Sequence, residues 1–266
     1  MPESWDFFVT PPVGGRLGKP RDFGVTMLID KGLSLGETRN LLELGAPHID
    51  FLKLSFGTIA LYPPKVLAKK AALAAEYHVA VYPGGTYFEI CYWRGQWQDY
   101  FYKLLRLGLE WVEISDGTLD LTQSEREQAI RAAKAAGLKV ITEVGKKNPC
   151  CRVDEWSLAE SAERDLELGA SWVIIESRES GHGIGIYDQN GAIIEEKLQA
   201  FSDRLPQRRI LWEAPLKNQQ ARLINDFGPN VNLGNIQPSE ALALEALRLG
   251  LRSDTWRVET PELSRV

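Results

Sequence analysis

Five acidic residues that follow short apolar runs are the first candidates for chemistry in this sequence. They come from five separate runs: Asp30, Glu113, Glu143, Glu176 and Glu213. If these runs are neighbouring parallel strands, their carboxyl ends lie at the same end of the fold, and the five side chains converge there. A ring of carboxylate oxygens suits a hard cation such as Mg²⁺. The sequence therefore predicts a magnesium site at this end.

Basic residues at the ends of some of these runs and of one further run change the chemistry that is expected. They are Lys31, Lys53, Lys146, Lys147 and Arg178. Side chains alternate along a strand, so Glu143 and Lys147 share one parity and face the same pocket. Cations grouped around carboxylates describe a pocket for a small polyanion, and phosphate is the first expectation. The alternative is a purely structural network in which these acids and bases only pair with one another.

Turns rich in glycine and asparagine add candidates for anion binding. Residues 84–86 (Gly-Gly-Thr) could present backbone N–H groups, although a glycine pair is equally consistent with a tight turn. Residues 232–235 end the last apolar run just before a helix start at 238–240, where barrels commonly bind phosphate. Three glycines within 181–185 predict a mobile lid or a plain flexible loop.

The elements that must position these residues alternate regularly. The predicted strands are 25–30, 49–54, 79–82, 111–115, 139–144, 172–177, 210–214 and 231–236. The predicted helices are 35–44, 64–77, 98–107, 124–136, 154–168, 192–201, 218–226 and 239–249. Eight strand–helix units in about 240 residues are typical of a closed barrel, whereas an open doubly wound sheet needs fewer strands and a glycine-rich first turn. We therefore predict an α/β protein with a single (β/α)₈ TIM barrel.

Composition limits the domain organisation, the partners and the cellular location that can be expected. The 266 residues are 44% hydrophobic and carry a formal net charge of −5, with no basic run for nucleic acid. We expect one domain over 1–266, with an N-terminal extension at 1–22 and a C-terminal tail at 252–266. The three cysteines, Cys91, Cys150 and Cys151, do not suggest a disulfide framework. With no apolar stretch of about 18 residues and no export signal, we expect a cytoplasmic protein without a membrane span.

Nine sequence motifs occur in a fixed order along nearly the whole length of the predicted barrel. They are KPR (19–21), GVTMLIDKG (24–32), YPGGTYFE (82–89), VEISDG (112–117), TEVGKK (142–147), VIIESRESG (173–181), EAPLKNQQ (213–220), VNLGNI (231–236) and GLR (250–252). In this order and number they resemble the phosphosulfolactate synthase family. Several long motifs in the right order are much more specific than any one of them alone.

The resemblance implies a Mg²⁺-dependent (β/α)₈ lyase that adds sulfite to the methylene carbon of phosphoenolpyruvate and forms (2R)-phospho-3-sulfolactate. Attack by sulfite pushes negative charge onto the substrate carboxylate, which a metal ion stabilises, and a general acid must protonate the adjacent carbon. By motif position and parity, Lys147 is the expected acid, Lys146 is the second choice, and Glu143 belongs to the same catalytic group. The expected metal ligands are drawn from Asp30, Glu113, Glu143, Glu176 and Glu213. The expected substrate-binding residues are Lys31, Lys53, Arg178, Lys217, Gly85, Thr86, Asn232 and Asn235.

The chain departs from the family pattern after the second predicted strand. The family typically carries Lys-Phe-Gly-Trp-Gly-Thr there, whereas this chain reads KLSFGT at 53–58, with Ser55 and Phe56 in place of a glycine and a tryptophan. The family is also similar to plant heat-stress-associated proteins that keep the barrel. A non-catalytic or differently catalytic role in heat-stress tolerance is therefore the alternative function, and a lyase or aldolase with another nucleophile is a third. We expect a homo-oligomer in each case.

Overall fold

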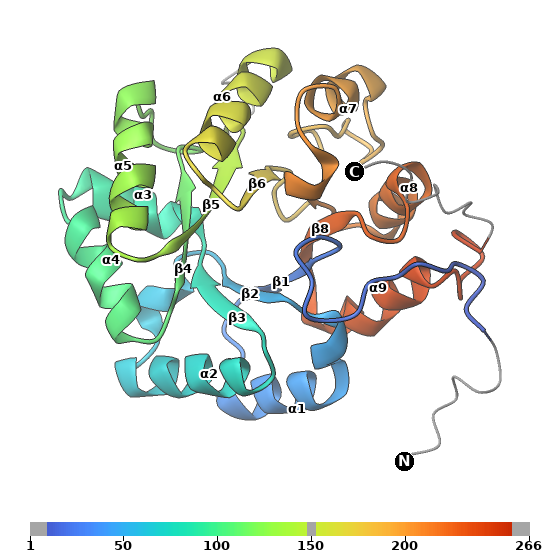
Figure 1. Cartoon of the computed structure of the whole chain (residues 1–266), viewed down its shortest axis with the longest axis horizontal. Helices are drawn as coiled ribbons and strands as arrows, with labels where there is room; N and C mark the ends of the chain where they lie inside the picture. Colours follow the sequence, from blue (N-terminus) through green and yellow to red (C-terminus); the bar gives the residue numbers. More distant parts are fainter. Residues whose placement is uncertain (1–9, 148–152, 257–266) are drawn as a thin grey trace.

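The fold is a nearly closed barrel of eight parallel strands. The computed structural model describes residues 10–147 and 153–256, so Cys150, Cys151 and the outer parts of both predicted extensions lie outside the described residues. The strands follow the order β3-β2-β1-β8-β7-β6-β5-β4, and β3 and β4 lie next to each other without a hydrogen-bonded ladder. Helices surround the strands (Figure 1). The predicted (β/α)₈ barrel is confirmed.

The strands coincide closely with the predicted apolar runs. They are β1 Thr26–Asp30, β2 Phe51–Leu54, β3 Ala80–Pro83, β4 Trp111–Ser115, β5 Lys139–Val144, β6 Trp172–Ile175, β7 Ile210–Glu213 and β8 Asn232–Ile236. Two of them, β4 and β5, have the predicted bounds. The register places Ser115 of β4 opposite Glu143 of β5, so the charged ends of these two strands lie side by side.

The helices follow the strands, with one more than the sequence analysis expects. In the described part of the chain they are α1 Leu35–Gly45, α2 Pro64–Glu76, α3 Gly85–Trp93, α4 Trp97–Arg106, α5 Gln123–Ala135, α6 Glu155–Glu167, α7 Glu195–Ser202, α8 Lys217–Phe227 and α9 Ala241–Arg248. Short 3₁₀ helices are η2 Ala46–His48, η3 Thr58–Leu61, η4 Gln207–Arg209 and η5 Pro238–Glu240. The additional helix, α3, begins at Gly85, where a turn was expected.

Local sequence fixes where several helices begin. Ser34 precedes α1, where its hydroxyl accepts the N–H of Glu37 and the Glu37 carboxylate accepts the N–H of Ser34. Thr122 and Glu125 make the same reciprocal pair before α5. Such pairs satisfy N–H groups that have no partner inside the first turn. The helices therefore begin just after the loops that carry the polar strand ends.

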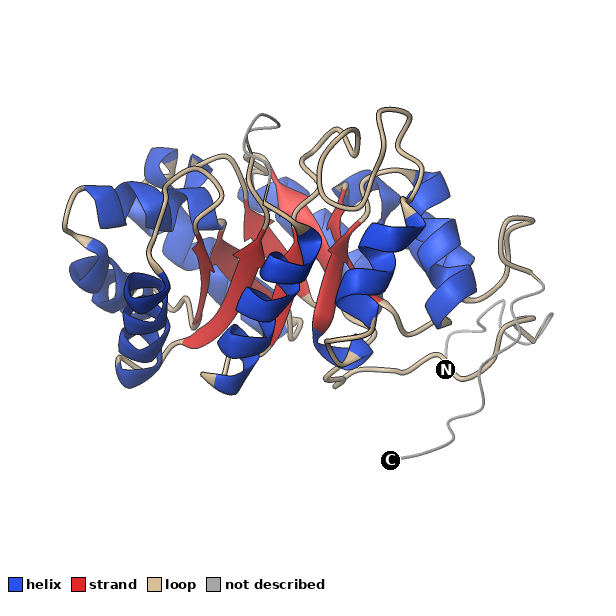
Figure 2. Ribbon diagram, turned by 90° about the horizontal axis from the view of Figure 1, so that it is seen from above, coloured by secondary structure: helices blue, strands red, loops and turns tan. Residues whose placement is uncertain are grey.

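Alternation along the strands divides the core into two parts. Side chains of one parity pack between strands and helices, as Leu28 of β1 and Leu52 of β2 do. Side chains of the other parity fill the barrel interior, as Met27 and Phe51 do. Inside the barrel, the aromatic rings of Phe51, Trp111 and Trp172 contact one another near the amino ends of the strands. The carboxyl ends are left for polar groups such as Lys53 and Glu143. Figure 2 shows the strands between flanking helices, with loops connecting their ends.

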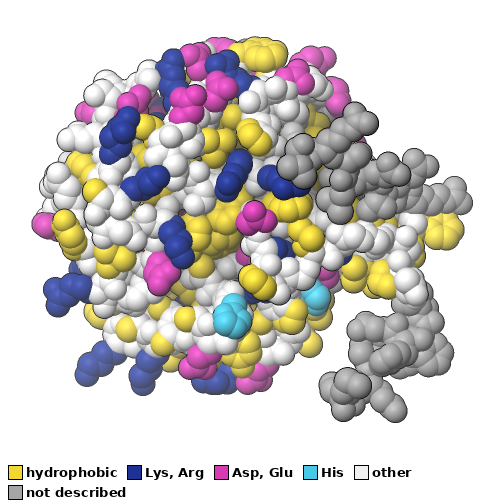
Figure 3. Space-filling view, in the orientation of Figure 1, with side chains coloured by type: hydrophobic (Ala, Val, Ile, Leu, Met, Phe, Trp, Pro, Cys, Tyr) yellow, Lys and Arg dark blue, Asp and Glu magenta, His cyan; other side chains and the backbone are white. Residues whose placement is uncertain are grey.

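The described part of the N-terminal extension is bound to the barrel near α9. The N–H of Val13 donates to the carbonyl of Leu249 at 3.2 Å, and Arg16 forms an ion pair of 3.0 Å with Glu245 of α9. On the face shown in Figure 3, acidic and basic side chains are interspersed and hydrophobic side chains gather near the centre. No helix of the described chain is long and apolar enough to cross a membrane.

Candidate active site

A buried lysine lies among three glutamates inside the carboxyl end of the barrel. The ammonium of Lys53, on β2, lies 3.0 Å from Glu113, 3.1 Å from Glu143 and 3.4 Å from Glu213. All four side chains share the inward parity of their strands and are almost completely buried. The carboxylates that the sequence predicts to converge therefore do so, but around an ammonium group.

A second lysine stands beside this group, nearer the solvent. Lys147 Nζ lies 2.7 Å from Glu143 Oε1, 3.5 Å from Glu176 Oε2 and 3.2 Å from the hydroxyl of Thr86. Its side chain is 19% exposed, whereas those of Glu143 and Glu176 are buried. Glu143 thus bridges the two lysines, accepting Lys147 on one oxygen and Lys53 on the other.

Backbone N–H groups hold the carboxylates in place. Gly85, at the start of α3, donates to Glu113 Oε1 at 2.6 Å. Arg178 donates through its backbone to Glu176 Oε1 at 2.6 Å, and Ser177 donates to Glu213 Oε2 at 3.1 Å. Charge-assisted bonds of this kind are strong and fix orientation. The acids are therefore preorganised by the loops that follow β3 and β6.

Burial and neighbouring charges both shift the pKa values of these groups, and for Glu113 and Lys147 the two effects oppose each other. Burial raises the pKa of Glu113 to about 7, because Lys53 offsets only part of the desolvation cost. Burial, with the charges of Glu143 and Glu213, raises the pKa of Glu176 well above its ordinary range. Burial alone would lower the pKa of Lys147, but Glu143 and Glu176 raise it above its ordinary value. Lys147 therefore remains protonated at neutral pH.

Three residues at this end hold a backbone conformation that side chains disfavour. Phe56, Arg178 and Asn235 have φ values of 57°, 62° and 61°. A positive φ costs energy in a residue other than glycine, and such residues cluster at functional sites. The side-chain amide of Asn235 donates to the carbonyl of Arg178 at 2.9 Å, which connects the loop after β6 to strand β8.

These groups surround a cavity of about 650 Å³ at the carboxyl ends of the strands. The described residues that line it include Lys53, Phe56, Gly85, Thr86, Glu113, Thr118, Glu143, Lys146, Lys147, Glu176, Arg178, Glu179, Glu213 and Asn235. Barrels of this kind bind their substrates at this end. The cavity is large enough for a small organic phosphate, and both ammonium groups and carboxylates line it.

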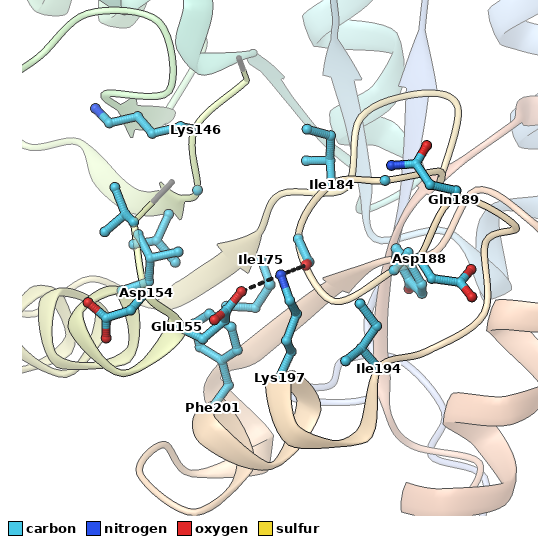
Figure 4. Close-up of a pocket in the computed structure, with 17 residues that line it drawn as sticks. Lys146, Asp154, Glu155, Ile175, Ile184, Asp188, Gln189, Ile194, Lys197 and Phe201 are labelled. Atoms are coloured by element: carbon cyan, nitrogen blue, oxygen red, sulfur yellow. Dashed lines mark hydrogen bonds and ion pairs between the residues drawn. The ribbon is translucent and has the colours of Figure 1, made fainter. Parts of the chain in front are cut away.

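A larger cavity of about 870 Å³ lies beside it (Figure 4). Lys146 lines both cavities, but apolar side chains of Ile175, Ile184 and Phe201 dominate the second. Lys197 and Glu155 form an ion pair within it. Asp188 accepts backbone N–H groups of its own loop, so the charges of this cavity do not converge on one point. The first cavity, where cations and carboxylates converge, is therefore the candidate active site.

Four predicted site residues lie outside this group. Asp30 has the outward parity of Leu28 and forms a buried ion pair with Lys70 of α2, so it is not brought to the other carboxylates. Asn232 accepts N–H groups of Gly24 and Val25 at 2.7 and 3.1 Å, at the amino end of the barrel. The placement of Asp30 and Asn232 therefore corrects the expectation that they face the site.

The other two are exposed basic residues. Lys217 forms a surface ion pair of 2.6 Å with Asp254, away from the cavity. Lys31 pairs with Glu179 and lies 5.6 Å from the ring centre of Phe56, two residues that line the cavity. Lys31 is therefore at the rim of the cavity, and the expectation for Lys217 is corrected.

Two residues that contact the charged group, Ser115 and Glu89, are not predicted from the sequence as functional candidates. Ser115 ends β4 with the inward parity of Glu113, and its hydroxyl lies 3.0 Å from Glu143 Oε1 and 2.9 Å from Glu89 Oε1. Strand parity alone could have identified Ser115. Glu89 is on α3, the helix that was not predicted, so its placement could not be derived from strand ends.

The donor set offers oxygen atoms to a cation but does not form a complete shell. Glu113 Oε2 and Glu176 Oε2 are buried and accept no hydrogen bond, but Lys53 Nζ lies 3.0 Å from the first and Lys147 Nζ lies 3.5 Å from the second. Within the described residues, no three His, Cys, Asp or Glu side chains are arranged to hold one metal ion. Mg²⁺ commonly binds through one or two carboxylates together with water and substrate oxygens, and Glu176 fits that mode.

Comparison with known proteins identifies the family. Residues 14–254 match the family model of (2R)-phospho-3-sulfolactate synthase (ComA). The chain is 43% identical over 254 residues to phosphosulfolactate synthase of Methanothermobacter thermautotrophicus, covering 93% of this chain and 96% of the relative. It is 37% identical over 254 residues to phosphosulfolactate synthase of Bacillus subtilis, covering 94% of this chain and 98% of the relative.

Solved structures support the fold alone. A 3-hexulose-6-phosphate synthase superimposes with a TM-score of 0.54 at 16% identity, covering 84% of this chain and 98% of that one. The resemblance expected from the motifs is confirmed by the family model and by both relatives. Because the match spans the barrel and the whole charged group, the chain belongs to the phosphosulfolactate synthase family.

Proposed function

We propose that this protein adds sulfite to phosphoenolpyruvate and forms (2R)-phospho-3-sulfolactate, with Lys147 as the general acid. The observation that carries the proposal is the Lys147 ammonium, which Glu143 and Glu176 hold at the inner wall of a cavity in a chain of this family. The names of the relatives support the reaction.

In the proposed reaction, the sulfur lone pair attacks the methylene carbon and forms the C–S bond. The electrons of the double bond move toward the substrate carboxylate, and Lys147 then gives its proton to the carbon that bears the phosphate ester. Lys147 regains a proton from solvent. The carboxylates around Lys147 keep it in the acid form before the reaction, which is the state that a proton donor requires.

Substrate binding is assigned to the remaining cations of the cavity. Arg178 and Lys146 line its wall, Lys53 lies at its floor and Lys31 at its rim. Phosphate, carboxylate and sulfite groups are anions that such side chains bind. We propose that Glu176 binds Mg²⁺ in its ionised form, because its buried Oε2 accepts no hydrogen bond and its ion-pair distance to Lys147, 3.5 Å, is longer than the 3.0 Å between Glu113 Oε2 and Lys53. When bound, the ion would stabilise the negative charge that develops on the substrate carboxylate.

The experiment is ³¹P NMR of the purified protein with phosphoenolpyruvate, sulfite and Mg²⁺, repeated with EDTA. We expect a new phosphate ester signal that requires sulfite and metal. Lys147→Ala should abolish it while thermal unfolding shows an intact fold. A Lys147→Ala variant with the wild-type rate would refute the acid assignment. No product and no thermal protection by phosphoenolpyruvate would favour the role in heat-stress tolerance.

We also propose a homo-oligomer. Two large apolar side chains of α3, Ile90 and Trp93, are exposed. Exposed apolar side chains that form one patch commonly mark an interface. Sedimentation equilibrium should give a multiple of the 29.8 kDa chain mass. A single species of the chain mass at micromolar concentration would contradict this proposal.

A further inference from the structure

Glu89 on α3 lies behind the charged group and joins this helix to the loop that follows β4. Its Oε2 accepts the N–H groups of Thr118 and Leu119 at 2.8 and 2.6 Å. Its Oε1 accepts the hydroxyl of Ser115 at 2.9 Å. Glu89 is only 3% exposed, so these bonds are shielded from water. One side chain therefore fixes both the end of β4 and the start of its loop.

This loop supports the backbone of Lys147. The N–H of Lys147 donates to the carbonyl of Gly117 at 2.9 Å. The loop also packs against the lysine stem, because a Cβ atom at Gly117 would lie 3.1 Å from Lys147 Cγ and 3.2 Å from the carbonyl oxygen of Gly145. A displacement of residues 117–119 would therefore move Lys147.

A second connection between Glu89 and Lys147 runs through the side chains of Ser115 and Glu143. The Ser115 hydroxyl lies between Glu89 and Glu143, at 2.9 Å from one carboxylate and 3.0 Å from the other. The same Glu143 oxygen is bonded to Lys147 Nζ at 2.7 Å. Glu89 itself is 3.9 Å from Lys147 Nζ, which is too far for a hydrogen bond. It also stands outside the set of described residues that line the cavity.

We infer that Glu89 is a positioning residue, which fixes Lys147 through the β4 loop and through Ser115 without touching the substrate. The catalytic part of this inference rests on the proposed function, because Lys147 is the acid assigned there. The structural part, the support of the Lys147 backbone, stands independently of the reaction.

The test compares Glu89→Ala and Glu89→Gln with the wild type. The Ala variant loses all three acceptor bonds, and kcat should fall by roughly 10- to 100-fold, because a shift of about 1 Å in a catalytic group can cost 10²-fold. KM for phosphoenolpyruvate and for sulfite should change less than about threefold, because the substitution removes no group that binds the substrates in the ground state. The Gln variant keeps an oxygen for the two N–H groups and should restore most of kcat.

Hydrogen exchange supplies a readout that does not depend on turnover. The amides of residues 118, 119 and 147 should exchange faster in Glu89→Ala than in the wild type, and nearly normally in Glu89→Gln. Glu110→Ala is the matched control, because Glu110 is an exposed acid just before β4, paired only with Lys139 among the described residues. It should change neither kcat nor exchange at these amides.

Specific results would overturn the inference. Unchanged kcat in Glu89→Ala would remove the positioning role, and a rise of KM with kcat unchanged would make Glu89 a substrate-binding residue instead. Normal exchange at residue 147 in the Ala variant would refute the support of the backbone. If the wild-type protein forms no product, the proposed function fails separately, and exchange at residue 147 still decides the structural claim.

Discussion

Lys53 shows what a buried cation does among three buried carboxylates. Its ammonium neutralises part of the charge of Glu113, Glu143 and Glu213 inside the barrel. Removing one partner from a buried ionic group leaves the others without compensation, which costs far more than the group contributes when intact. Breaking the network therefore costs a large part of the free energy of unfolding. Because the network lies at the cavity floor, the same residues contribute to the stability of the fold and to the site.

The first prediction concerns this lysine. Lys53→Met keeps the length of the side chain but removes its charge, and it should lower the free energy of unfolding by about 3–5 kcal/mol at pH 7. The measurement is urea unfolding followed by circular dichroism. Lys31→Met is the control, since Lys31 is in an exposed ion pair and its loss should cost less than about 1 kcal/mol. Equal losses in both variants would show that Lys53 does not hold the network together.

Much of the site could be predicted from the sequence at the level of single residues. Parity on the fifth strand places Glu143 and Lys147 on the same side, as the structure does. Applied to the first strand, the same rule separates Asp30 from the site, because Asp30 shares the parity of Leu28, which packs against the helices. What parity cannot give is the ion pairing, since that depends on side-chain conformations from several strands at once.

At the scale of elements, α3 is the part of the fold that the sequence concealed. Residues 84–86 look like a turn because of their two glycines, and the aromatic and aliphatic residues that follow do not form one apolar stripe. The glycine at the helix start has a packing role instead. A Cβ atom at Gly85 would lie 2.4 Å from Ser115 Cβ and 3.0 Å from Glu113 Oε1. Helix α3 can approach β4 this closely only with glycine there.

The second prediction tests this close approach. Gly85→Ala should destabilise the fold by about 1–3 kcal/mol, the usual cost of overpacking, and should lower activity because Gly85 orients Glu113. Gly36→Ala, in the exposed first turn of α1, is the matched control. Its Cβ meets only Ser34 Oγ at 4.0 Å, so it should stabilise the fold by about 0.5–1 kcal/mol. Thermal unfolding of both variants gives the comparison. A stabilised Gly85→Ala would mean that α3 has room to move.

The strands were the most predictable elements. Apolar β-branched runs bounded by polar turns gave all eight, with β4 and β5 at the predicted bounds. The ends of β6 differ because Glu176 and Ser177 leave the ladder, where Glu176 accepts the N–H of Arg178. Strand order and register follow from closing successive units into a barrel. The missing ladder between β3 and β4 could not be predicted, because it depends on how α3 packs beside β4.

At the scale of the whole molecule, both ends of the barrel carry buried charges, but they have different roles. At the carboxyl ends the charges surround a cavity. At the other end, Glu245 of α9 connects the N-terminal extension to the barrel, with Arg16 at 3.0 Å and His48 at 3.7 Å. Arg16 also donates to the carbonyl of Gly24 at 2.8 Å, just before β1. This second network has a structural role, and it gives the fold a dependence on pH.

The third prediction follows from the ionisation of Glu245. Burial alone would raise its pKa, but contacts with His48 and Arg16 hold the pKa well below its ordinary value. A lowered folded-state pKa stabilises the fold fully above the unfolded value of about 4.3, and this stabilisation is lost as the pH falls below about 5. Glu245→Gln should therefore be less stable than the wild type at pH 7, by about 3–5 kcal/mol. The difference should narrow between pH 5 and 3, as measured by urea unfolding at each pH. A difference that stays constant over this range would mean that Glu245 stabilises the extension by packing rather than by charge.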